Sequence, residues 1–247
     1  MGLTACIYTK DNERTVGEAL RSVRFADEVI LLDSGSTDRT VEIGRSLADR
    51  VEHRAWTGFR DQLNHIPTLA SHEWILVVDA DERVTEAGAK EILEVLQHPQ
   101  GAVAFNLPRQ TLYMGRWLRH GEFYPDHTLR LYTKGCGSYE GEPHARLVPK
   151  GPVRNLGEPL LHHMQRHLGD QLDTMRRYSE SQAREMAARG VRSARLQALV
   201  HPLQRFFKGY VFKAGFLDGW PGFVAAATAS FHVFLKYVRV EEMSGEC

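Results

Sequence analysis

The sequence lacks any excess of charge, and this absence bears on its partners. Among its 247 residues, 31 are Lys or Arg and 31 are Asp or Glu, so the formal net charge at pH 7 is zero. Proteins that hold a nucleic-acid backbone usually carry a surplus of basic residues. The composition therefore predicts no nucleic-acid partner, although it leaves room for a local basic patch.

Cysteine is also scarce. Cys6, Cys136 and Cys247 match no zinc or redox spacing, and an odd number does not suit a disulfide framework. This usage favours a reducing compartment, most simply the cytoplasm. The chain begins with a strand-like segment and not with a basic region followed by an apolar run, so we expect no signal peptide.

Long apolar runs are absent as well. The longest nearly apolar run covers residues 223–235 and contains Thr228, Ser230 and His232. A helix that spans a bilayer needs ~20 apolar residues. The sequence therefore predicts that this segment is too short to cross a membrane, although it could lie on one.

Two common phosphate-binding motifs are missing. Neither G-x-G-x-x-G nor G-x-x-x-x-G-K-[ST] occurs in the chain. Their absence weakens the interpretations of the protein as a dinucleotide-binding enzyme or a P-loop enzyme.

What the first 110 residues do contain is an alternation of strand and helix patterns. We expect strands at 3–8, 28–33, 50–53 and 74–79, and helices at 15–23, 37–47, 60–69 and 85–96. Strands that alternate with helices predict an α/β fold with a mostly parallel sheet flanked by helices.

The pattern changes after about residue 102. Short strands, such as 102–107 and 129–132, lie among Gly, Pro and aromatic residues, and loops of this kind often contact substrates. Three helices should follow, at 168–189, at 196–210 with a break at Pro202, and up to about 240. We therefore predict a catalytic domain at 1–165 and a helical, aromatic and basic extension at 166–247. The catalytic domain would consist of a nucleotide-binding half, about 1–108, and an acceptor-side part, about 109–165.

Acidic residues follow two of the expected strands. Asp33 ends the second strand, while Asp79 ends the strand at 74–79 and Asp81 comes just after it. Ligands of parallel α/β sheets bind at the carboxyl ends of strands, where carboxylates can hold a divalent cation. Such a cation would neutralise a diphosphate and help it to leave. A lone Asp-x-Asp is more often a turn or a helix cap, but its position after an apolar strand favours a metal site.

Several segments together resemble the inverting family 2 glycosyltransferases. They are residues 9–13 (TKDNE), 33–40 (DSGSTDRT) and 74–82 (WILVVDADE). Residues 56–64 (WTGFRDQLN) are similar to the branch that contains bacterial lipopolysaccharide core β-glucosyltransferases. The resemblance implies a GT-A (Rossmann-like) fold, a nucleoside-diphosphate sugar as donor, most commonly UDP-linked, and Mg²⁺ or Mn²⁺ as cofactor.

The resemblance also assigns residues to the donor side. It implies that Thr9 and Glu13 lie in the nucleoside pocket and that Asp33 recognises the base. Gln62 and Asn64 would lie on the donor side of the site.

For the metal, the resemblance implies that Asp79 and Asp81 form the Asp-x-Asp pair, with Asp81 the more direct ligand. His162, at the end of an apolar stretch, is a further candidate for contact with the metal or the diphosphate. The alternative interpretation is that His162 is simply a polar residue at the end of a strand.

The general base is harder to assign. An inverting transfer needs a base to take the proton of the acceptor hydroxyl. Many relatives carry a His-Glu pair after a segment like residues 129–132 (LRLY), but here the corresponding segment is 141–145 (GEPHA), with Ala145 in the place of the glutamate. Glu142 is the first choice for the base, followed by Glu140 and Asp126. Each could equally be a solvated loop carboxylate.

Residues 205–239 combine many aromatic residues with Lys and Arg. Segments of this kind suit the interface of a membrane with anionic lipids, and a lipid-linked acceptor would fit that location. A helical lid over the core and an oligomer contact are the alternatives.

The leading hypothesis is a metal-dependent inverting hexosyltransferase. It would transfer a hexose, from UDP-glucose or a similar donor, to lipopolysaccharide core or a related cell-envelope glycan or glycolipid. It would work in the cytoplasm, where a peripheral position on the cytoplasmic face of the inner membrane is open to it. The alternatives are a sugar nucleotidyltransferase, which can share the βαβ start and an acidic metal site, and a non-catalytic protein that binds sugar nucleotides.

Overall fold

The computed structural model describes residues 1–142, 145–163, 168–191 and 194–244. Contacts between residues divide the chain into two compact units. The first, here called the sheet unit, consists of residues 1–110 and 126–163. The second, the helical unit, consists of residues 111–125 and 164–247, so that segment 111–125 groups with the C-terminal helices. The domain boundary at 165/166 stays a prediction, and the two units are described separately.

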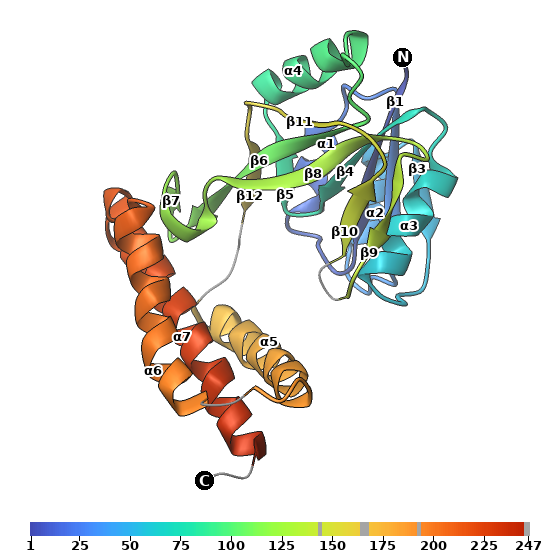
Figure 1. Ribbon diagram of the computed structural model, residues 1–247. Coiled ribbons are helices and arrows are strands. Elements are labelled where there is room, and N and C mark those ends of the chain that lie inside the picture. The colour runs from blue at the N-terminus through green and yellow to red at the C-terminus, as the bar shows by residue number, and fades with distance from the viewer. Residues whose placement is uncertain (143–144, 164–167, 192–193, 245–247) are drawn as a thin grey trace. The chain divides into compact units, whose positions relative to one another are not determined.

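Four parallel strands form one half of the main sheet. They are β1 (Leu3–Thr9), β2 (Glu28–Asp33), β3 (Arg50–His53) and β4 (Trp74–Asp79), in the order β3-β2-β1-β4 (Figure 1). Helices α1 (Val16–Ser22), α2 (Thr40–Leu47) and α3 (Phe59–Leu69) connect them. The α/β fold with flanking helices, as the sequence predicts, is confirmed here.

The other half of the sheet is largely antiparallel. Strand β8 (Asp126–Thr133) pairs antiparallel with both β4 and β6 (Ala104–Tyr113). Beyond them lie β12 (Leu160–His163) and β5 (Glu82–Val84), also an antiparallel pair, and β11 (Val153–Asn155) runs parallel to β6. A separate hairpin joins β9 (Gly137–Glu140) to β10 (Arg146–Pro149), and α4 (Glu86–Gln97) follows β5.

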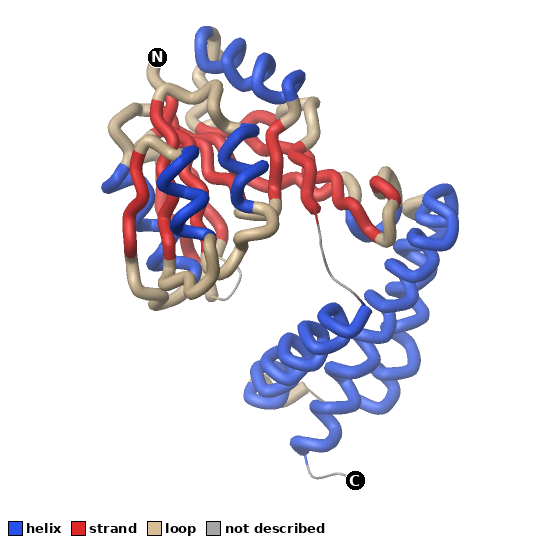
Figure 2. Tube along the Cα trace, turned by 180° about the vertical axis from the view of Figure 1, so that it is seen from behind, coloured by secondary structure: helices blue, strands red, loops and turns tan. Residues whose placement is uncertain are grey.

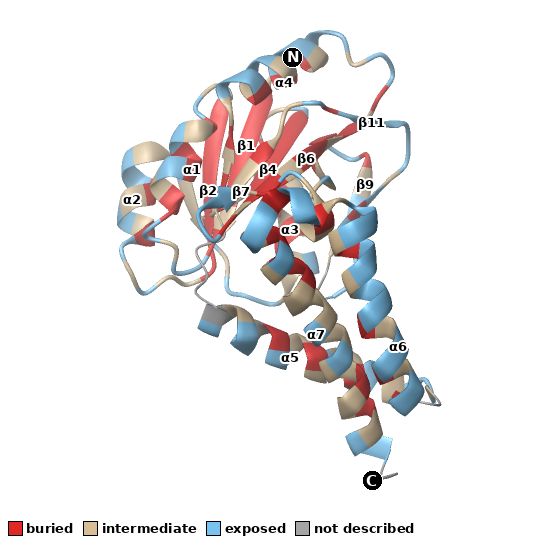
Figure 3. Ribbon diagram, turned by 90° about the vertical axis from the view of Figure 1, so that its left-hand side faces the viewer, coloured by how far each residue is buried: buried red, intermediate tan, exposed pale blue. Residues whose placement is uncertain are grey.

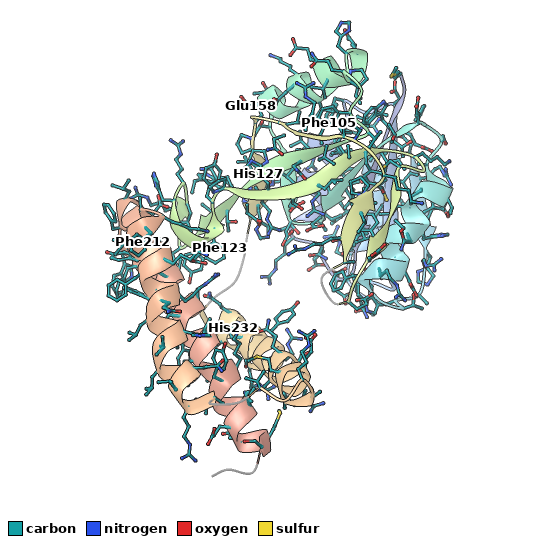
Figure 4. The ribbon with its side chains drawn as sticks, viewed as in Figure 1. Phe105, Phe123, His127, Glu158, Phe212 and His232 are labelled. Carbon is teal, nitrogen blue, oxygen red and sulfur yellow. The ribbon has the colours of Figure 1, made fainter. Side chains whose placement is uncertain are left out.

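Apolar side chains cover both faces of this sheet. Alternate residues of a strand point to opposite faces. On one face Leu31 and Leu76 belong to a core cluster with residues of α1, α2 and α4. On the other, Ile30 and Val77 pack with residues of α3 and of the β9–β10 hairpin. The central strands are accordingly buried along most of their length (Figure 3), and Phe105 of β6 lies among the core side chains (Figure 4).

Local sequence determines where α4 begins but not where α2 begins. Thr85 caps α4, since its side chain accepts a hydrogen bond from Gly88 N at 2.9 Å, as the sequence led us to expect. Helix α2 begins at Thr40 and not at residue 37, because residues 34–39 form a loop that is held by Asp33 and by side chains of the loop after β1.

The described part of the helical unit is mostly helical (Figure 2). Its long helices are α5 (Leu168–Ala188), α6 (Ala194–Phe207) and α7 (Gly219–Ser244), and both α5 and α6 pack along α7. A π-turn (Lys208–Phe212) and a 3₁₀ turn (Gly215–Asp218) join α6 to α7. The short strand β7 (Arg116–Trp117) pairs with the end of β6, and a 3₁₀ turn (Gly121–Phe123) follows it.

The expected break at Pro202 is wrong. Helix α6 runs through Pro202, which is buried, and Ser230 Oγ of α7 donates a hydrogen bond of 2.7 Å to Pro202 O. Packing against α7 and this additional hydrogen bond thus accompany a proline inside the helix, where its ring would otherwise favour a break.

Helix α7 is longer than the apolar run at residues 223–235 from which it was predicted. The helical stretch Gly215–Ser244 is long and apolar enough to cross a membrane by length and composition alone, with 22% of its most apolar window buried. The expectation that this segment is too short rested on residues 223–235 and is wrong on length, because the helix extends past that run at both ends.

Candidate active site

The ends of the parallel strands surround a cavity of about 400 Å³. In the strand registers Thr9 of β1 pairs with Asp33 of β2, and Tyr8 pairs with Asp79 of β4, so these side chains reach one edge of the sheet. The cavity is lined by Tyr8, Thr9, Lys10, Asn12, Ser34, Trp56, Phe59, Asp79, Ala80 and Asp81. A cavity at the carboxyl edge is where α/β sheets hold ligands.

The loops after β1 and β2 hold each other through reciprocal hydrogen bonds. These bonds, of 2.7 to 3.1 Å, join Asp11 N to Ser36 Oγ, Thr37 N to Asp11 Oδ1, Asn12 N to Thr40 Oγ1, Glu13 N to Asp38 Oδ2 and Arg39 N to Glu13 Oε2. Each side chain satisfies a backbone N–H of the opposite loop. The two acidic segments that the sequence singles out therefore form one rigid wall. Glu13 serves in that wall and is not among the cavity-lining residues.

Asp33 is buried and its carboxylate is turned to its own loop. It accepts hydrogen bonds from Gly35 N at 2.9 Å, from Ser36 N at 3.1 Å and from Ser36 Oγ at 2.5 Å. Burial raises the pKa of Asp33, but these hydrogen bonds outweigh it and the net pKa is lowered. Asp33 thus shapes the loop that brings Ser34 to the cavity, while the predicted contact of Asp33 with the base stays a prediction.

Asp79 is part of a buried ion cluster. Arg130 of β8 donates from Nη2 to Asp79 Oδ2 at 2.6 Å and to Glu82 Oε1 at 2.7 Å. Burial opposes ionisation of Asp79, but Arg130 and the neighbouring Tyr8 hydroxyl outweigh it, so the pKa of Asp79 is lowered. Burial is the main cause that raises the pKa of Glu82. Asp79 Oδ1 is buried and has no hydrogen-bond partner in the part of the chain that the structure describes.

The cluster continues to Asp126. Arg109 Nη1 lies 3.5 Å from Glu82 Oε1, and Arg109 also donates to Asp126 Oδ2 from Nε at 3.0 Å and from Nη2 at 2.5 Å. Acidic and basic groups therefore alternate from Asp79 through Arg130, Glu82 and Arg109 to Asp126. The chain of ion pairs links two carboxylates that the sequence analysis selects for different roles.

Asp81 and His162 come together although they are distant in sequence. Strand β12 pairs with β5, His163 N donates to Asp81 O at 2.9 Å, and His162 Nε2 lies 3.4 Å from Asp81 Oδ2. Two ligands at right angles on Mg²⁺, each ~2.1 Å from the ion, stand about 3 Å apart. The Asp81–His162 pair therefore fits a shared divalent cation with little adjustment. Within the described ranges no three His, Cys, Asp or Glu residues cluster as a metal site. An ion here would complete its shell with water and substrate oxygens.

Gln62 and Asn64 lie on different sides of α3. The fully buried Gln62 donates from Nε2 to Ser34 Oγ at 2.8 Å and so supports a residue of the cavity wall. Asn64 exchanges hydrogen bonds with the backbone of Tyr139, from Nδ2 to Tyr139 O at 2.9 Å and from Tyr139 N to Oδ1 at 2.8 Å. Asn64 therefore pins strand β9 to α3 and is not among the residues that line the large cavity.

The candidate bases have different surroundings. Glu142 Oε1 accepts a hydrogen bond of 2.8 Å from Arg60 N, in the first turn of α3, and so acts as a helix cap beside the cavity-lining Phe59. Glu140 ends β9 with an exposed side chain. The half-buried Ala145 packs against the core cluster that includes Tyr139. The histidine of this segment, His144, lies outside the described residues.

Sequence reasoning missed the aromatic side of the cavity. Trp56 and Phe59 make an edge-to-face contact with ring centroids 4.7 Å apart, and Trp56 remains 44% exposed. Lys10 and Asn12 line the same space. Their positions in the sequence could have indicated them, because all four residues follow strands that end at the same edge of the sheet.

Comparisons with known proteins agree with this architecture. The chain is 27% identical to an uncharacterised glycosyltransferase of Rickettsia bellii, an alignment that covers 99% of this chain and 88% of the relative. It is 26% identical to the lipopolysaccharide core biosynthesis glycosyltransferase LpsC of Rhizobium meliloti, over 96% of this chain and 91% of that protein. The crystal structure of TarS 1–349 from S. aureus shares the fold, with a TM-score of 0.50 at 14% identity, and the match covers 100% of this chain and 92% of TarS. The family model for glycosyl transferase family 2 matches residues 4–157, and the protein belongs to this family of glycosyltransferases.

Proposed function

We propose that this glycosyltransferase moves a hexose, from UDP-glucose or a similar donor, to lipopolysaccharide core or a related cell-envelope glycan, with inversion and with Mg²⁺ or Mn²⁺. The observation that carries the proposal is the Asp81–His162 pair at the edge of the donor-sized cavity. The similarity to LpsC, which is named for lipopolysaccharide core biosynthesis, supports the acceptor class. Membership of the family makes the protein an enzyme that transfers glycosyl groups, which argues against both the nucleotidyltransferase and the non-catalytic alternative.

The metal would be held by Asp81 and His162, and water and substrate oxygens would complete its shell. When bound, such an ion stabilises the negative charge that develops on the departing diphosphate. Arg130 leaves Asp79 ionised and fixed in position. The exposed Lys10, which lines the cavity, would add a positive charge for the diphosphate.

The nucleoside would lie against the wall made by the first two loops. Thr9 lines the cavity directly, whereas Asp33, Glu13 and Gln62 would act by holding the loops that shape it. Trp56 offers a ring face to a base or a sugar, since it is half exposed and held at its edge by Phe59. Asn64 would contribute to the donor side indirectly, by holding β9 in position through its hydrogen bonds to Tyr139.

Asp126 and Glu142 are the proposed bases for the acceptor hydroxyl. Asp126 is supported by its link to Asp79 through the ion cluster, and Glu142 by its position beside Phe59 at the cavity. A base acts only in the transition state, so its loss should lower kcat and leave KM nearly unchanged. Asp126→Asn and Glu142→Gln should therefore differ sharply in kcat. Glu142→Gln can also lose stability by weakening the α3 cap, which a melting curve would detect.

Donor and metal are tested together by thermal shift. We expect a UDP-hexose to stabilise the protein more than GDP- or dTDP-sugars do, and only with Mn²⁺ or Mg²⁺ present. Asp81→Asn should lose this shift and about a thousandfold in turnover, because several kcal/mol of charge stabilisation depend on the ion. Asp173→Asn, on an exposed face of α5, is the matched control. Metal-dependent turnover that survives in Asp81→Asn would refute the metal role, and an anomeric configuration retained in the product would refute inversion.

A cytoplasmic location is also part of the proposal. Cys6 and Cys136 are both free and buried, which is consistent with a reducing compartment. Trypsin accessibility in intact and lysed cells would test it: protection before lysis supports the proposal, and digestion of the protein in intact cells contradicts it.

A further inference from the structure

Helix α6 turns its large apolar side chains outward. The residues that it buries are small or short, namely Ala194, Ala198 and Pro202. Its exposed apolar residues follow at intervals of three and four and form one stripe: Leu196, Leu199, Val200, Leu203 and Phe207. Leu199, for example, is 66% exposed. A surface helix normally places such a stripe toward the core, so in α6 the stripe is free to meet a partner.

The stripe continues into the segment that joins α6 to α7. This segment exposes Val211, Phe212, Phe216, Leu217 and Trp220. Phe212 is 83% exposed and Trp220 66%, and Phe212 stands out from the end of the helical unit (Figure 4). The rings are held in place by one another, since Trp220 stacks on Phe223 with centroids 5.3 Å apart. We call the α6 stripe and these five residues the apolar surface.

Among the described charged side chains in the loops beside the apolar surface, only basic ones are exposed. Lys208 and Lys213 are exposed in the joining segment, and Arg116 and Arg119 are exposed in the hairpin that packs on it. The acidic residues of the same region are buried and engaged. Glu122 pairs with Arg205, and Asp218 Oδ2 accepts hydrogen bonds from Arg119 N at 3.0 Å and His120 N at 2.8 Å. The rim of the apolar surface is therefore positive.

We infer that the apolar surface docks on an anionic lipid bilayer, with α6 lying in the plane of the interface. Aromatic rings at the level of the headgroups and lysines facing anionic lipid are the chemistry that such an interface selects. A second copy of the chain fits less well. A two-fold contact would press Lys208 and Lys213 against the same positive rim of the partner.

Insertion of α7 as a spanning helix fits less well too. Its polar side chains bind the other helices along most of its length: Thr228 to Gln171 at 3.2 Å, His232 to Gln182 at 3.3 Å, Tyr237 to His201 at 2.7 Å and Arg239 to Glu180 at 3.6 Å. Moving α7 into the hydrocarbon would break these contacts or bring the charged α5 with it. Docking on the surface keeps the helical unit intact.

Vesicle co-sedimentation of the full chain tests the inference. We expect binding to phosphatidylcholine vesicles that contain phosphatidylglycerol, weaker binding to phosphatidylcholine alone, and a decrease with added salt. Phe212→Ser with Trp220→Ser should lower the partition coefficient at least tenfold on both vesicles. Lys208→Glu with Lys213→Glu should lower it about twentyfold or more on the anionic vesicles, since each basic residue near the surface contributes about a fivefold change.

Matched controls lie on α4. Leu93→Ser removes an exposed apolar side chain and Lys90→Glu reverses an exposed charge there, and neither should change vesicle binding. The inference is overturned if the wild-type chain does not bind anionic vesicles or if both double variants bind as well as it does. It is also overturned if light scattering finds a dimer that Phe212→Ser dissociates. The UDP-sugar thermal shift should persist in the double variants, so a failure here is distinct from a failure of the proposed donor chemistry.

Discussion

The sheet unit and the helical unit use apolar side chains in opposite ways. Strands β1, β2 and β4 bury nearly all of theirs, whereas α6 buries alanines and leaves leucines in solvent. Burial in the sheet unit is the main source of stability. The apolar side chains of α6 contribute little to folding, so their presence requires another explanation, and a binding surface provides one.

Charged groups show a second contrast. The sheet unit buries an ion cluster around Arg130 at the edge of its cavity, while the ion pairs on α5, such as Arg184 with Glu180, are exposed. A buried cluster fixes geometry at a cost in solvation, and exposed pairs mainly solvate a helix. The difference indicates that precise positioning is needed at the sheet edge.

The largest expected effect concerns that cluster. Arg130→Met should leave Asp79 and Glu82 buried without their shared partner and destabilise the protein by ~3–5 kcal/mol. Arg184→Met, which breaks an exposed pair of α5, should cost no more than ~0.5 kcal/mol. Urea unfolding followed by circular dichroism measures both. Equal costs would contradict the contrast between buried and exposed ion pairs.

Leucine truncation compares the two units directly. Leu76→Ala opens a cavity in the core of β4 and should cost ~2–5 kcal/mol. Leu199→Ala on the apolar surface should change stability by no more than ~0.5 kcal/mol. The same unfolding experiment applies. A large cost for Leu199→Ala would mean that α6 is covered in solution.

A third prediction uses pH. Glu28 accepts hydrogen bonds from Thr4, from Ser71 and from Arg50. Burial raises the pKa of Glu28, but these bonds outweigh it and lower the pKa to about 2. A lowered folded pKa stabilises the protein above the unfolded value of ~4.3, by up to ~3 kcal/mol, and this contribution is lost as pH falls toward the folded value.

The wild-type chain should therefore exceed Glu28→Gln in stability at pH 7, and the gap should shrink between about pH 4 and pH 2. Denaturation midpoints at both ends of that window measure it. Glu94→Gln, at an exposed position of α4, should show no such trend. A gap that does not change with pH would show that Glu28 acts through packing alone.

The smallest effect is expected at the β9–β10 hairpin. Asn64→Ala removes both hydrogen bonds to the backbone of Tyr139 and should cost ~1–2 kcal/mol. Asn64→Asp keeps an acceptor for Tyr139 N and should cost less. Hydrogen exchange at the Tyr139 amide should speed up in the alanine variant. Unchanged protection there would show that the hairpin is held by its apolar contacts instead.

Strand prediction located all four parallel strands, including the partly exposed β3, and missed the short strands β9 to β12. Strands buried on both faces are continuous apolar runs, which is why β1, β2 and β4 could be located to within a residue. Strands β9 to β12 have only three or four residues each and carry too little periodicity to detect. Helix α6 continues through Pro202 because of a neighbour that is distant in sequence.

The roles predicted for the site residues stay predictions, and the structure shows where these residues lie. Thr9, Asp79 and Asp81 line the cavity because strands that end in polar residues bring them to one edge. The donor-side role of Asn64 stays a prediction, and in the structure its amide pairs with the backbone of β9. Residues 62 and 64 of one helix cannot share a face, which local spacing could have indicated.

The sequence by itself determined which edge of the sheet carries the acids, because the acids follow directly after their strands and parallel strands bring their carboxyl ends to one edge. Only the tertiary structure decided which carboxylates have partners. Arg130 takes one oxygen of Asp79, and β12 brings His162 to Asp81. It also decided that the α6 stripe faces solvent. Periodicity defines two sides of a helix, and packing against other segments determines which side is covered.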